Sequence, residues 1–494
     1  MNLGQSIRSS VKWLVVGTFG SRIMTFGFGI ALARLLVPDD FGVLATIRVF
    51  TGFAGMLMSA GMGQSLIRAK EADESDFNSV FTMQLAMSIV IYLSFFWSAP
   101  LISAFFERPV YTSLIRASTL VFLLRPFLHI RIAWLSRKMN FKDRSIANIV
   151  AGVISNSSAV MMAFFGFGVW SLILSGLLDA FATNLMLTIF VPLRLKPVLN
   201  IAAMRRHSSY GFKITVNEFL GYLTRESRNL ILSKLAGASF LGLFNKSESL
   251  AKLPNEMFMS ATMQPVFRGL SEVQDDLDKT KYMLYRVITL LMVYTIPIYV
   301  ILWWISGPFI EVVYGPKWLA VIEPLRILVI AGFFFNILFP CSRLLDAQNL
   351  LWQEMVVLVG RLVVVTTACI VGLRWGLEGV AWGVLIAHIF AAVAVYYLVY
   401  RALPTRVNDL VKAITPGVVL NSMLFLFLAV CDFSLRYLGV TSQAVYLMLL
   451  TIFGAGFYGV VFLLMPIASM QGEQERWMKK INGGVRLAYR GISR

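Results

Sequence analysis

Residues 18–42 read TFGSRIMTFGFGIALARLLVPDDFG, a run of small and apolar side chains with Arg22 in its first half. The apolar run extends from about 11 to 36, which is long enough to cross a hydrocarbon core of ~30 Å as a helix. An arginine at the centre of such a helix costs roughly 2.5–3.5 kcal/mol on insertion scales. The stretch therefore predicts a membrane helix whose charge has a functional partner.

Similar apolar runs recur along the whole chain. Of its 494 residues, 58% are hydrophobic and 14% are charged, and the mean hydropathy is +0.74. Such values are far from those of a soluble globular domain, so we expect an all-α, polytopic membrane protein. The expected fourteen spans lie near 11–36, 41–66, 79–105, 113–134, 147–165, 169–192, 208–235, 240–266, 282–306, 319–342, 355–373, 378–400, 412–432 and 442–467.

Basic residues alternate between the loops that these spans define. One set of alternate loops, together with the C-terminal tail, carries nineteen basic residues, and the other set carries four to six. Because cytosolic loops are enriched in lysine and arginine, both termini are expected in the cytosol, which requires an even number of spans.

A short pattern recurs two hundred residues apart. Residues 32–44 read LARLLVPDDFGVL and residues 232–244 read LSKLAGASFLGLF, so that L-x-[RK]-L is followed by glycine at one fixed distance. Chance agreement is one explanation. The other explanation is a parallel repeat. Six spans separate the two copies, and because six is even, both copies would have the same orientation in the membrane. The repeat predicts one six-helix bundle at 1–200, a second at 201–402, two additional helices at 403–470 and a basic cytosolic tail at 471–494.

Several classes of function are disfavoured. The three cysteines and three histidines are scattered, so we expect no metal site and no cofactor. The net charge of +18 follows the loops rather than a nucleic-acid-binding face, so no nucleic-acid partner is expected. There is no GxxxxGK[ST] loop for ATP and no nucleophile–base pair, so we do not expect an enzyme.

Arginines lie on small, polar faces of three expected helices. Arg22 shares a face with Thr18, Thr25 and Gly29, and Arg48 shares one with Gly52, Gly55, Ser59 and Gly63. In the seventh span, Arg225 and Arg228 continue a face that begins at Asn217 and Gly221. The alternatives are arginines that reach the headgroups or pair with a carboxylate, most of all for Arg48, and a small-residue ridge used only for packing.

Two further sites lie in the first half. Arg125 and His129 are four residues apart in the fourth span, where they form either a polar cavity wall or an interfacial anchor. Pro126 is expected to bend this helix and Arg131 to reach the cytosolic interface. Asp179 in the sixth span is a candidate proton-coupling group or arginine partner.

The C-terminal tail is basic. It reads either as an amphipathic segment on the inner leaflet, with Trp477, Ile481 and Val485 on one side, or as a simple positive-inside stop.

Guanidinium groups inside a membrane favour an anionic substrate. Arginine presents a planar fork that binds two oxygens at once, which suits phosphate, whereas an exporter of cationic drugs needs carboxylates. Charge and spacing do not say which anion is bound.

Longer motifs resemble a known family. The motifs are the L-x-R-L-L-x-P-x-x-F-G core at 32–42, the G-x-G-x-x-L-I-R exit at 61–68, and the stretches FRGLSEVQDD, VVYGPKWLAVIEPLRIL and LLDAQN. Together they are similar to the motifs of bacterial polysaccharide (Wzx-type) flippases of the multidrug/oligosaccharidyl-lipid/polysaccharide exporter superfamily. The resemblance extends to about residue 400 and is greatest to the exopolysaccharide branch, which handles colanic acid and succinoglycan units.

The resemblance implies two facing six-helix bundles that move an undecaprenyl-pyrophosphate-linked oligosaccharide to the outer leaflet for exopolysaccharide biosynthesis. It implies a location in the bacterial inner membrane, membrane lipids as surroundings, and a polysaccharide polymerase and export machinery as candidate partners. Arg22, Arg48, Arg225 and Arg228 fit the cavity arginines of such relatives in role, although Arg225 and Arg228 are not at the repeat position of Arg22. A cation-coupled drug exporter of the same superfamily and a non-transporting scaffold of the assembly complex are the alternatives.

Overall fold

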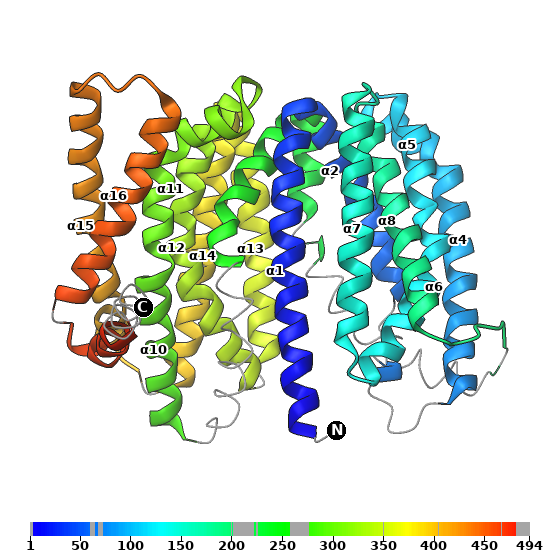
Figure 1. Cartoon of the computed structure of the whole chain (residues 1–494), viewed down its shortest axis with the longest axis horizontal. Helices are drawn as coiled ribbons and strands as arrows, with labels where there is room; N and C mark the ends of the chain where they lie inside the picture. Colours follow the sequence, from blue (N-terminus) through cyan, green and yellow to red (C-terminus); the bar gives the residue numbers. More distant parts are fainter. Residues whose placement is uncertain are drawn as a thin grey trace, which may run out of the picture. The chain divides into compact units, whose positions relative to one another are not determined.

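The described part of the chain is helical, with no strand. The computed structural model describes residues 3–59, 65–67, 73–198, 200, 222–223, 226–256, 276–348, 350–403, 405–465 and 467–480. They fall into two compact units, Met1–Asn245 and Lys246–Arg494. The predicted all-α polytopic fold is confirmed. Figure 1 shows the helices as long rods, each traceable by its label.

The first unit contains seven labelled helices. They are α1 (Leu3–Leu35), α2 (Pro38–Ser59), α4 (Glu74–Phe106), α5 (Val110–Thr119), α6 (Val121–Arg137), α7 (Phe141–Phe164) and α8 (Val169–Phe190). A further helical stretch, residues 226–256, begins in this unit.

The labelled elements of the second unit follow in chain order. Its members are α10 (Leu277–Tyr294), α11 (Ile296–Phe309), η1 (Ile310–Tyr314), η2 (Pro316–Val321), α12 (Ile322–Ala347), α13 (Leu351–Gly372), η3 (Leu373–Trp375), α14 (Gly376–Ala402), α15 (Val407–Tyr437), α16 (Gln443–Leu464) and η4 (Ala468–Met470). The ranges of α4, α7 and α8 recur about 200 to 210 residues later as α10 to η1, α13 and α14, which supports the repeat. The expected domain boundaries stay a prediction.

Ten described segments are long and apolar enough to span a membrane, and one of them, Trp352–Ala402, contains both α13 and α14. They coincide with eleven of the fourteen expected spans. The expected first span is helical as α1, but the expected spans 208–235 and 240–266 lie partly outside the described residues. Within 226–256 the predicted turn between them is marked by Gly237, whose φ of 87° is readily adopted only by glycine.

Local sequence signals account for several helix ends. The carboxylate of Asp73 accepts from the backbone N–H of Asp76 at 2.9 Å and caps α4, and Asp276 caps α10 by accepting from the N–H of Lys279 at 3.1 Å. The expected fourth span is broken at Leu120 into α5 and α6, whereas Pro126 lies inside α6. A similar break at Thr295 precedes Pro297, which occupies the first turn of α11, where proline is tolerated.

The two copies of the repeated pattern lie against each other within the first unit. A Cβ on Gly42 would lie 1.6 Å from the carbonyl oxygen of Ala238, and one on Gly242 would lie 1.9 Å from that of Pro38. Because Ala238 and Gly242 follow Pro38 and Gly42 by 200 residues each, the contact is reciprocal. It is the arrangement expected where two parallel repeats meet at their symmetry axis.

Charged side chains bridge the helix ends near this contact. Arg108 forms a 2.7 Å ion pair with Asp39, and Lys234 forms a 2.9 Å ion pair with Glu107. The hydrogen bond from Lys234 lowers the pKa of Glu107 below its ordinary value. These pairs join α2, the α4–α5 turn and the helix at 226–256 at one end of the unit.

Candidate functional site

Arg48 lies at the centre of α2. It is ten residues from the first residue of the helix and eleven from the last, and its side chain is exposed. A side chain so far from either end reaches a headgroup poorly, so the interfacial alternative for Arg48 loses support. Glu226 lies within electrostatic range of the guanidinium.

Tyr222 fastens the next segment of chain to α2 beside Arg48. Its hydroxyl donates to the backbone carbonyl of Val49 and lies 3.4 Å from that of Arg48. A Cβ on Gly52 would be 2.7 Å from this hydroxyl oxygen, so the absence of a side chain at position 52 makes the approach possible. The sequence marked Gly52 as part of an arginine face but gave no signal for Tyr222, because this contact depends on tertiary structure.

Arg125 approaches the same face of α2 from α6. A Cβ on Gly55 would lie 2.0 Å from Nη1 of Arg125, so the guanidinium occupies the space that a side chain would need. Its Cζ lies 5.0 Å from the ring centroid of Phe122, which is within cation–π range. Within the described residues Arg125 has no hydrogen bond or ion pair. His129, one turn along α6, is half-buried and electrostatically coupled to it.

These contacts bring together part of the expected constellation. Positions 48, 52 and 55 are spaced by four and three residues and share one face of α2. Arg48 projects from that face, Tyr222 packs at Gly52, and Arg125 packs at Gly55. This Arg48–Arg125 face combines two guanidinium groups with one nearby carboxylate, Glu226. The arrangement suits an anion that carries several oxygens.

The other predicted arginines have no described contact with the Arg48–Arg125 face. Arg228 is buried, 8% exposed, and its Cζ lies 5.2 Å from the ring centroid of Phe244. Arg225 lies outside the described residues, as do Asn217, Gly221 and Gly63. Arg22 is half-buried on α1, which packs mainly against α7 in the described structure (Figure 1).

The expectation for Arg131 was wrong. Its side chain is 8% exposed rather than interfacial, and Nη1 lies 3.3 Å from both the Asn184 side-chain oxygen and the Phe127 carbonyl oxygen. The hydrogen bond to Asn184 connects α6 to α8, and Nε of Arg131 is buried without a hydrogen bond in the described structure. The residue therefore joins two helices in the structure.

Asp179 accepts a hydrogen bond of 3.1 Å from the hydroxyl of Ser155 on α7. Its side chain on α8 is exposed. The described contacts give Asp179 a serine partner rather than an arginine partner. Its role in coupling stays a prediction.

A hydrogen-bonded pair that the sequence reasoning missed lies in the second unit. Nη2 of Arg361 on α13 lies 3.3 Å from Nε2 of His388 on α14, and Nδ1 of the imidazole lies 2.8 Å from the Val384 carbonyl oxygen. In the tautomer whose Nδ1–H donates to that carbonyl, Nε2 accepts a hydrogen bond from the guanidinium. The available signal was an arginine near the middle of the expected span 355–373.

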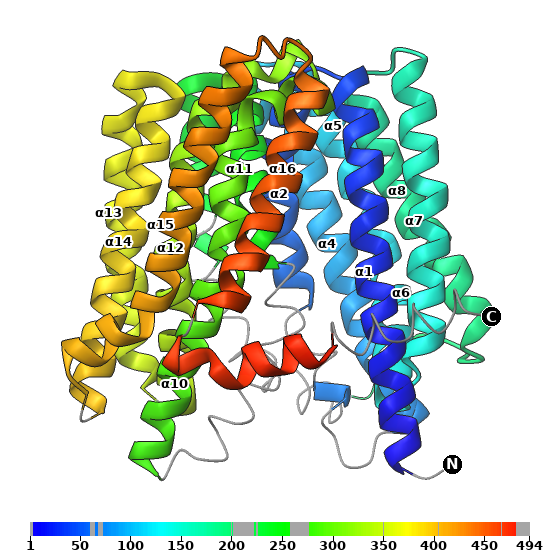
Figure 2. The ribbon, with the colours of Figure 1, turned by 60° about the vertical axis from the view of Figure 1, so that its left-hand side comes forward.

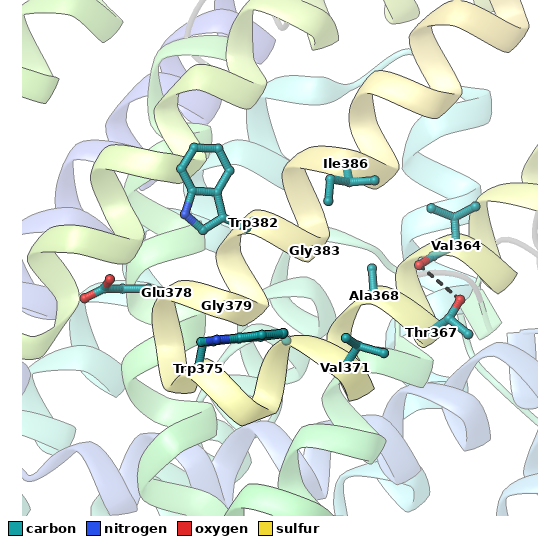
Figure 3. A pocket seen from close by; sticks show the side chains of 11 residues that line it. Val364, Thr367, Ala368, Val371, Trp375, Glu378, Gly379, Trp382, Gly383 and Ile386 are labelled. Atoms are coloured by element: carbon teal, nitrogen blue, oxygen red, sulfur yellow. Dashed lines mark hydrogen bonds between the residues drawn. The ribbon is translucent and has the colours of Figure 1, made fainter.

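A groove of about 620 Å³ lies between α13 and α14 of the second unit (Figure 3). Its walls are mainly apolar and include Trp375 and Trp382, with Thr367 among the few polar groups. None of the predicted site residues lines it. The two helices approach closely because Gly372 and Gly379 meet backbone to backbone.

Comparison with known proteins identifies the family. A family model described as "polysaccharide biosynthesis protein" matches residues 31–323, more than half of the chain. The chain belongs to this polysaccharide biosynthesis family.

Two curated proteins are similar to this family member over most of their own length. The succinoglycan biosynthesis transport protein ExoT of Rhizobium meliloti (strain 1021) is 25% identical over 343 residues, which are 68% of each chain. The lipopolysaccharide biosynthesis protein WzxC of Escherichia coli (strain K12) is 22% identical over 408 residues, 81% of this chain and 82% of WzxC.

A solved structure has a similar fold. The lipid II flippase MurJ in an inward closed conformation matches with a TM-score of 0.69 and 16% identity, over 91% of this chain and 99% of MurJ. The similarity confirms that the family member is a multi-pass helical membrane protein. It also agrees with the resemblance drawn from the motifs.

Proposed function

We propose that this family member is a flippase that moves undecaprenyl-pyrophosphate-linked oligosaccharide repeat units across the bacterial inner membrane for exopolysaccharide biosynthesis. Its termini lie in the cytosol, and its partners are the lipid-linked substrate, membrane lipids and a polysaccharide polymerase with its export machinery. The relation to ExoT, a succinoglycan transport protein, and to WzxC supports this substrate class.

The observation that carries the proposal is the position of Arg48. A fixed positive charge at the centre of a spanning helix, with an exposed side chain, is stable only where water or an anion meets it. Arg125 packs at Gly55, about two helical turns farther along the same face, and has no hydrogen bond or ion pair among the described residues. Two guanidinium groups match the several oxygens of a pyrophosphate.

The proposed transport cycle divides the substrate among three environments. The pyrophosphate binds the Arg48–Arg125 face, with Arg22, Arg225 and Arg228 as further candidate contacts. The glycan occupies hydrated space beside this face, and the prenyl chain stays in lipid. Rearrangement of the halves then exposes the head group to the other side, as in alternating access.

Polymer export in cells tests the proposal. Arg48→Gln and Arg125→Gln are expected to reduce export at least about tenfold while protein abundance stays normal, because each loses one charge-assisted contact to the anion, worth roughly 1.5–3 kcal/mol. Arg436→Gln is the matched control, since this arginine is exposed beside Asp432 on α15. Normal export by both variants would exclude a pyrophosphate at this face.

Two alternatives give different results in purified vesicles. A scaffold moves no labelled lipid-linked sugar, and a cation-coupled drug exporter moves an organic cation instead. The positive sign of the Arg48–Arg125 face disfavours a cationic substrate.

A further inference from the structure

The chain continues after α16 into a helix that lies across the end of the second unit. Residues 471–480 are helical and follow the short segment η4. Figure 2 shows this helix in red, running crosswise to α16 rather than along it. We call residues 471–480 the tail helix.

Polar contacts hold the tail helix in this crosswise position. Nε2 of Gln474 donates to the carbonyl oxygens of Phe462 and Met465, at 2.6 and 2.7 Å. Glu473 forms a 3.3 Å ion pair with Arg286 of α10. The tail helix is therefore attached to both α10 and α16 by its own side chains.

One face of the tail helix is turned to the protein. Glu473, Gln474 and Trp477 of the tail helix, with Met470 of η4 directly before it, follow the i, i+3, i+4, i+7 spacing of a single helical face. Met470 and Gln474 are buried, and Nε1 of Trp477 lies 3.2 Å from the hydroxyl of Tyr294. The indole ring is nevertheless 45% exposed, which places it at the border between the protein and its surroundings.

The remaining surface of the tail helix is exposed and basic. The side chain of Arg476 is 77% exposed, and Lys479 and Lys480 are also exposed, beside one exposed carboxylate, Glu475. Met478 adds an apolar side chain that is 42% exposed. From residue 471 to 494 the sequence has six basic residues and two acidic ones. A basic cluster with a half-exposed tryptophan, directly after a membrane helix, has the composition of a segment that binds an anionic leaflet.

We infer that the tail helix binds the anionic phospholipid headgroups of the leaflet at its end of the protein. Arg476, Lys479 and Lys480 contact the phosphates, while Trp477 and Met478 lie at the boundary with the acyl chains. Only the identity of that leaflet, the cytosolic one, rests on the orientation proposed above. Lipid binding itself is independent of transport, so the two proposals are tested separately.

Spin-label depth measurements on the full chain in nanodiscs test this inference. The label is attached at Met478→Cys in a Cys431→Ser background, because Cys341 and Cys369 are buried. Replacing part of a phosphatidylcholine bilayer by phosphatidylglycerol is expected to lower the accessibility of the label to a water-soluble relaxation agent about threefold, and high salt should reverse the change.

A charge-matched pair of triple variants completes the test. Arg476→Gln with Lys479→Gln and Lys480→Gln is expected to abolish the response to phosphatidylglycerol. The control variant combines Lys279→Gln, Arg406→Gln and Lys412→Gln, which removes three exposed charges elsewhere in the same unit. This variant should preserve the response to phosphatidylglycerol. Equal shielding of the label in neutral and anionic bilayers, or equal loss of the response in both triple variants, would overturn the inference.

Discussion

Gly42 and Gly242 face each other across the contact between α2 and the helix at 226–256. A Cβ added to Gly242 would lie 3.0 Å from the backbone nitrogen of Gly42 and 1.9 Å from the Pro38 carbonyl oxygen. Both glycines are repeat mates, and each contacts the residue that precedes the other by four positions. The close backbone approach explains why the repeated pattern ends in glycine.

Gly42→Ala should therefore destabilise the first unit. The added methyl group meets backbone atoms of Ala238, which cannot rotate away as a side chain can, and we expect a loss of about 1–3 kcal/mol. Thermal unfolding of the purified protein in detergent measures this loss of stability. Gly27→Ala on α1, where nothing lies within 4 Å, is the control, and equal stability of the two variants would contradict the observed contact.

Gly55→Ala should impair transport with little loss of stability. Its methyl group would displace the guanidinium of Arg125, the far end of a flexible side chain that can rotate away. We expect a decrease in export of about tenfold or less, at normal protein abundance. Gly176→Ala on α8, with open space around it, should export normally. Full export by Gly55→Ala would show that the position of Arg125 is not important.

Asp179→Asn should preserve the fold and change the pH dependence of transport. An asparagine side chain retains the oxygen that accepts from Ser155 but has no charge to titrate. Export or vesicle transport measured across a pH series would report the change, with abundance as the control. A pH profile identical to that of the unmodified protein would remove Asp179 from any coupling role.

Gln474→Leu should release the tail helix from α16. The change leaves the carbonyl groups of Phe462 and Met465 without this donor, at a cost of about 1–3 kcal/mol. Limited proteolysis should then cleave the tail several times faster. Gln471→Leu, at an exposed position, is the control and should be cleaved at the original rate.

Much of the fold could be predicted because it depends on local composition and on a repeat. Apolar runs predicted the spans. The pattern at 32–44 and 232–244 suggested a repeat, but it gave no prediction that the two copies contact each other through Gly42 and Gly242. The break at Leu120 was missed, since neither glycine nor proline marks it in the sequence.

The candidate site was less predictable, because its contacts join distant parts of the chain. Spacing identified the α2 face that carries Arg48, Gly52 and Gly55, but not that Tyr222 and Arg125 fill the space beside the glycines. Arg131 was misassigned because its partner, Asn184, is 53 residues away in sequence. Arg361 was overlooked, although its partner His388 also lies in an expected span.

Translocation in reconstituted vesicles tests the central claim most directly. Purified protein is inserted into sealed vesicles with a fluorescent undecaprenyl-pyrophosphate sugar, and the fraction that becomes accessible on the opposite face is followed in time. We expect transport by the unmodified protein, at least about tenfold slower transport by Arg48→Gln, and partial rescue by Arg48→Lys, which restores the charge but not the fork. Equal rates for the unmodified protein and Arg48→Gln, or no transport by either, would contradict the proposed flippase.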